Sequence, residues 1–81
     1  MISESKKSLK PLVSVSAGSD VKLAIIDAGR ELKQRLANMG IMPGCLLHVL
    51  TNDRFGPFVI AIKGSRVILG RGMAQKIMVE Q

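Results

Sequence analysis

The chain has 81 residues, 47% of them hydrophobic, and a formal net charge of +6. This length excludes a second domain, and no apolar run approaches the roughly 20 residues that a membrane-spanning helix needs. The high apolar content excludes a disordered chain, and the single cysteine excludes an internal disulfide, so we expect a soluble, cytoplasmic protein.

The N-terminal quarter of the sequence predicts a leader and two strands. Residues 1–10 are polar and basic, so we expect a flexible leader before a single domain of residues 11–81. Val13 and Val15 alternate with serines, which predicts a short first strand. Residues 21–25 also alternate in polarity and predict a second strand. Its apolar positions, which we expect to face the core, are Val21, Leu23 and Ile25.

A short helix is predicted next, because Leu32, Leu36 and Met39 are spaced as one stripe of a helix. Arg30, Lys33 and Gln34 are free to face water. Gly40 is expected to end the helix in a left-handed conformation, with Ile41 packing back onto the last turn. Met42, Pro43 and Gly44 then predict a type II turn.

The second half of the sequence predicts further short strands at residues 45–50, 58–63 and 77–79. Gly64 and Ser65 favour a two-residue hairpin loop of type II′. That loop would pair Ile62 with Val67 and Ile60 with Leu69. Residues 70–74 predict no more than a single helical turn.

The predicted fold is mainly β, a small SH3-like β-barrel with one short α-helix inserted after the second strand. We expect the barrel to be closed, because closure removes exposed strand edges, which are a hazard for so aliphatic a chain.

Catalytic and metal-binding signals are poor. The carboxylates are scattered, and Cys45 and His48, the only cysteine and histidine, are expected on opposite faces of one strand. We therefore predict no enzyme and no required cofactor. Cys45 and His48 are only weak candidates for a transition-metal site, since structural zinc usually has four protein ligands. A second chain would have to complete such a site.

Two groups of motifs follow one another along the chain. The first is Gly29-x-x-Leu32-x-x-Arg35-Leu36-x-x-Met39-Gly40-Ile41-x-Pro43-Gly44. The second consists of Phe55-Gly56-Pro57, Lys63-Gly64-x-Arg66, Leu69-Gly70-Arg71-x-x-Ala74 and Ile77-x-Val79. Each motif alone indicates only turns, but their order and spacing over most of the chain resemble those of the FeoA family.

The resemblance implies an SH3-like barrel that acts in bacterial ferrous iron transport as an accessory to the membrane transporter FeoB, which carries a cytoplasmic GTP-binding domain. Arg35, Arg66 and Arg71 match the family pattern and are candidate partner-binding residues. The alternative for each is a solvated charge or a bridge to a backbone carbonyl. Met42, on the turn after the helix, is a candidate apolar anchor.

Two other functions are consistent with the sequence. The positive charge suits a small nucleic-acid-binding barrel, but Phe55 and Phe58 are the only aromatic residues for stacking, so we do not expect nucleic acid as the partner. A metal-responsive regulator or iron carrier would need more ligands than one chain offers. The aliphatic composition also makes a homodimer plausible.

Overall fold

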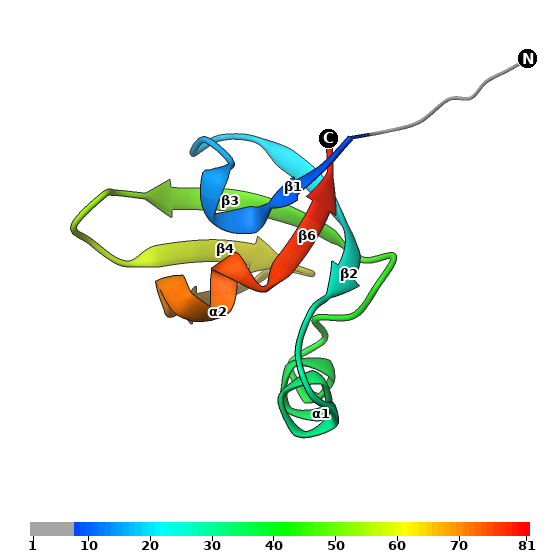
Figure 1. Ribbon diagram of the computed structural model, residues 1–81. Coiled ribbons are helices and arrows are strands. Elements are labelled where there is room, and N and C mark those ends of the chain that lie inside the picture. The colour runs from blue at the N-terminus through cyan, green and yellow to red at the C-terminus, as the bar shows by residue number, and fades with distance from the viewer. Residues whose placement is uncertain (1–7) are drawn as a thin grey trace, which may run out of the picture.

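The structure, a computed structural model, describes residues 8–81 (Figure 1). It contains six strands, which are β1 (Leu9–Pro11), β2 (Asp20–Ile26), β3 (Leu46–Asn52), β4 (Phe58–Ile62), β5 (Ser65–Leu69) and β6 (Ile77–Glu80). The helices are η1 (Leu12–Ser14, a 3₁₀ turn), α1 (Arg30–Asn38) and α2 (Arg71–Gln75). None of these helices is long and apolar enough to cross a membrane.

The strands form one antiparallel sheet in the order β1-β6-β2-β3-β4-β5. The sheet bends around the core, and α1 stands beyond its end between β2 and β3 (Figure 1). This confirms the mainly β fold with a helix after a strand near residue 20. The expected closure is not met, because β1 and β5 are the two ends of the strand order and are not paired with each other.

The core is made by alternate residues of the strands. Phe58, Ile60 and Ile62 of β4 are buried, as are Leu47 and Val49 of β3. The buried side chains of residues 8–81 are all apolar. Burial of aliphatic side chains is therefore the main source of stability, since each contributes about 1.5–3 kcal/mol relative to exposure.

The end of α1 follows the sequence expectation. Gly40 has φ +86°, and the amide groups of Gly40 and Ile41 donate to the carbonyls of Ala37 and Leu36, at 2.9 Å each. These two bonds define a Schellman cap, which requires a left-handed residue at the glycine position. The Cys45 amide then donates to the Met42 carbonyl at 3.1 Å, confirming the tight turn.

The N-terminal segment differs from the expectation. Leu9 and Lys10, which the sequence analysis assigns to the leader, belong to β1 and pair with β6. Residues 12–14 form a 3₁₀ turn instead of the predicted strand, because Val15 donates its amide hydrogen to the Leu12 carbonyl. The rest of the predicted leader, residues 1–7, lies outside the described part of the chain.

A β-bulge in β2 overturns the prediction that Ile25 faces the core. The pairing with β6 shifts between Leu23 and Ile25, so the side chains beyond it change sides. As a result Ile25 is 49% exposed and Ile26 is buried.

The β4–β5 hairpin also differs in its turn. Lys63 and Gly64 both have positive φ, +50° and +82°, which defines a type I′ loop in place of the predicted II′ loop. Ile62 therefore pairs with Ser65 and Ile60 with Val67. The shift from the predicted register is two residues, so every side chain keeps its face.

Candidate functional site

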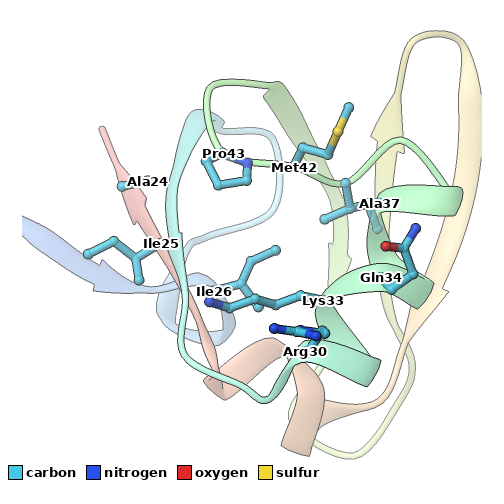
Figure 2. A pocket seen from close by; sticks show the side chains of 10 residues that line it. Ala24, Ile25, Ile26, Arg30, Lys33, Gln34, Ala37, Met42 and Pro43 are labelled. Carbon is cyan, nitrogen blue, oxygen red and sulfur yellow. The ribbon is translucent and has the colours of Figure 1, made fainter.

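A groove lies between β2, α1 and the turn that follows α1 (Figure 2). Its volume is about 520 Å³, and its lining residues are Ala24, Ile25, Ile26, Arg30, Lys33, Gln34, Ala37, Ile41, Met42 and Pro43. One wall is the inserted helix α1 and the other is strand β2.

The groove has two chemically different ends. Met42 and Pro43 lie at one end, and Arg30 and Lys33 lie at the other (Figure 2). Met42 is 43% exposed, so a flexible apolar side chain is available to a partner. The arrangement suits a ligand that carries an apolar group and a negatively charged group, because each end would attract one of them.

Local features of the sequence build this groove. The bulge in β2 turns the side chain of Ile26 toward α1, where strict alternation would have placed Ile25 (Figure 2). The Schellman cap turns the chain sharply after α1, which places Ile41 and Met42 beside the helix they follow. The groove therefore depends on two backbone irregularities.

Away from the groove, a hydrogen-bond network centred on Arg71 and Asn52 joins α2 to the end of β3 and to the 3₁₀ segment. Arg71 donates to Oδ1 of Asn52 at 2.9 Å and to the carbonyl of Asp53. The Asn52 side chain in turn donates to the carbonyls of Val13 and Val15, at 2.9 and 2.6 Å. This network holds the 3₁₀ segment against the end of β3, so it stabilises the fold.

Comparison with known proteins assigns the family. The model of the FeoA domain matches residues 10–81. This chain belongs to the FeoA domain family.

One curated FeoA relative is the protein described as a putative Fe(2+) transport protein A of Methanocaldococcus jannaschii. It is 47% identical over 70 residues, which are 86% of this chain and 84% of the relative.

Solved structures confirm the SH3-like FeoA fold. A crystal structure of an iron uptake regulatory protein, FeoA, has a TM-score of 0.83 and 32% identity, covering 90% of this chain and 97% of that one. A manganese-dependent transcriptional repressor has a TM-score of 0.83 and 29% identity. The match covers 94% of this chain but 43% of the repressor, so a FeoA-like fold also occurs within a larger regulator.

The four predicted partner-binding residues lie in different parts of the FeoA domain. Met42 lines the groove, whereas Arg35 is exposed on α1 and does not line it. Arg66 is exposed on β5. Arg71 is half-buried in the network with Asn52, which corresponds to the alternative of a bridge to a backbone carbonyl.

The two weak metal candidates of the FeoA domain are not brought together. Cys45 packs against the core, while Nδ1 of His48 lies 2.6 Å from Oδ1 of Asp20 on the outer face of the sheet. Within residues 8–81, His, Cys, Asp and Glu side chains form no group of three or more that would hold a metal ion.

Sequence reasoning missed Arg30 and Lys33, which it left as water-facing helix residues. A signal for them exists, since Arg30, Lys33, Gln34 and Ala37 are spaced as a second stripe of the helix, beside the Leu32–Leu36 stripe. This stripe of helix residues alone does not reveal a site, because the opposite wall of the groove comes from β2.

Proposed function

We propose that this FeoA-domain protein is a non-enzymatic accessory protein of ferrous iron uptake that binds, in the cytoplasm, the GTP-binding part of a FeoB-type iron transporter. Membership of the FeoA family and the iron transport description of its archaeal relative support the transport role. The proposal requires no cofactor on this chain.

The groove is the observation that carries the docking part of the proposal. Its apolar end and its two cations form a compact surface for a protein segment with an apolar side chain and a carboxylate. We therefore expect an acidic, partly apolar segment of the transporter to occupy it. Apolar contact supplies affinity, and the cations supply orientation and a faster association rate.

Binding of the detergent-solubilised transporter from the same organism tests this function. Arg30→Glu reverses charge inside the groove at the first residue of α1, where an acidic residue favours the helix. We expect this variant to keep its stability and to bind at least about tenfold more weakly, equivalent to about 1.4 kcal/mol. Arg54→Glu makes the same charge change in an exposed loop outside the groove and serves as the matched control.

An apolar pair of variants tests the other end of the groove. Met42→Ser should weaken binding, while Met39→Ser, at a methionine of similar exposure that does not line the groove, should not. If Arg30→Glu and Arg54→Glu bound the transporter equally well, the docking surface would have to lie outside the groove. Failure of the unmodified protein to bind the transporter would refute the proposed function itself.

The positive charge still favours one competing function, nucleic-acid binding. Phe58 is buried, so Phe55 is the one aromatic ring of the chain exposed for stacking on a base. Capture of nucleic acid instead of the transporter, with loss of binding between about 50 and 200 mM salt, would support this alternative.

A further inference from the structure

The free edge of β5 has unpaired main-chain groups at defined positions. A two-residue type I′ loop is flanked by a pair of residues that are hydrogen-bonded to each other, here Ile62 and Ser65. Along the rest of the hairpin, hydrogen-bonded pairs alternate with pairs that are not hydrogen-bonded. The amide and carbonyl groups of Ser65, Val67 and Leu69 therefore face β4. Those of Arg66 and Ile68 face away from it, and β4 is the one strand that pairs with β5 among residues 8–81.

Apart from the charge of Arg66, this edge lacks the features that usually protect a strand edge. The other end strand, β1, has three residues and includes Lys10 and Pro11, which discourage pairing. In contrast, β5 has five residues, no proline and no bulge. Ile68 is 73% exposed beside this edge.

We propose that two copies of this chain associate through β5, antiparallel and edge to edge, about a two-fold axis at Val67. In this register Arg66 of one copy lies opposite Ile68 of the other. Both residues direct their main-chain groups outward, so the two strands exchange four hydrogen bonds. The exposed side chain of Ile68 then packs on the aliphatic stem of Arg66 of the partner subunit.

Two neighbouring registers are less favourable. If the pairing slips by one residue, a residue whose main-chain groups point toward the other copy lies opposite one whose main-chain groups point toward its own β4. The hydrogen bonds between the two copies are then lost. A two-fold axis at Arg66 would place two guanidinium groups directly opposite each other, and like charges at that spacing destabilise a sheet. The register about Val67 avoids both problems and is self-complementary, which favours a second copy over an unrelated strand.

The contact is small and joins two chains of charge +6, so we expect weak association that strengthens as salt screens the repulsion. Docking through the cationic groove would weaken with salt. None of the β5 residues lines the groove, so this inference does not depend on the proposed function.

Analytical ultracentrifugation of the full chain, from about 10 µM to 1 mM, tests the proposal in the concentration range expected for weak complexes. We expect the weight-average mass to rise toward a dimer with concentration and with salt. Ile68→Lys should abolish the rise, because it sets a second cation opposite Arg66. Phe55→Lys, the same kind of change at a 96% exposed residue of the β3–β4 loop, should leave it intact.

Cross-linking tests the register in a Cys45→Ala background. An equimolar mixture of Arg66→Cys and Ile68→Cys chains should form disulfide dimers in high yield, and each chain alone should form far fewer, because residues 66 and 68 face each other across the axis. Circular dichroism verifies that the variants fold. A monomer at every concentration, equal behaviour of Ile68→Lys and Phe55→Lys, or no preference for the mixed cross-link would overturn the proposal.

Discussion

At the scale of single residues, Arg71 and Arg35 carry the same charge but have different roles in the structure. The Arg71 guanidinium bridges Asn52 and the Asp53 carbonyl, whereas Arg35 is exposed on α1 and no hydrogen bond of its side chain is described. The family pattern includes both arginines. Their surroundings, and not their charge, decide what each contributes.

This difference predicts unequal losses of stability. Arg71→Ala leaves Asn52 and a backbone carbonyl without their donor, so we expect it to lower the free energy of unfolding by about 1–3 kcal/mol. Arg35→Ala should change it by less than about 0.5 kcal/mol. Urea unfolding followed by circular dichroism measures both values. Similar values for the two variants would contradict the structural role of Arg71.

At the scale of elements, the bulge in β2 decides which isoleucine supports the core. Ile26→Ala removes a buried side chain and should cost about 2–5 kcal/mol. Ile25→Ala changes a half-exposed side chain and should cost less than about 1 kcal/mol. Strict alternation along β2 predicts the opposite order, so the same unfolding experiment distinguishes the two arrangements.

The sequence predicted those elements whose determinants are local. The helix, its glycine cap and the turn through Pro43 are each determined by a few consecutive residues, and the structure contains all three. Met39 of the predicted stripe, however, lies just past the end of α1 and is 46% exposed. The bulge in β2 and the 3₁₀ turn at residues 12–14 were not predicted. The bulge depends on pairing with the distant strand β6. The 3₁₀ turn is closed by the local bond from Val15 to Leu12, and the distant side chain of Asn52 holds it in place.

The candidate site was predicted only in part for the same reason. Met42 was predicted as an anchor from the turn motif that contains it, and it lines the groove. Arg30 and Lys33 were not, since the groove exists only where α1 meets a strand that precedes it in the chain. For the β4–β5 hairpin the predicted turn type was wrong. Because the observed pairing differs from the predicted one by two residues, each side chain of β5 still lies on the predicted face of the sheet.

At the scale of the whole molecule, charge is the property that distinguishes this small domain. The 12 basic residues of the full chain outnumber its 6 acidic ones, and the described ion pair, His48 with Asp20, joins exposed side chains. Repulsion among the excess cations therefore opposes the compact state.

Salt should accordingly stabilise the folded chain. Between about 0.01 and 0.15 M salt the screening length falls from roughly 30 to 8 Å, which is shorter than the domain is wide. We expect the thermal midpoint to rise by about 2–4 °C, corresponding to about 0.5 kcal/mol. Sodium and potassium chloride should act alike, as screening requires. A midpoint that falls with salt would show that attractive ion pairs outweigh the repulsion.

The pairing of β1 with β6 has a consequence for how this fold is combined with other proteins. Leu9 lies opposite Glu80, so the polypeptide enters and leaves the folded unit at adjacent points of one sheet. Opposed residues of an antiparallel pair are about 4.5–5.5 Å apart, a gap that a surface loop of another protein spans without distortion. Such a unit is suited to insertion into a host chain, or to circular permutation, without rearrangement of either structure.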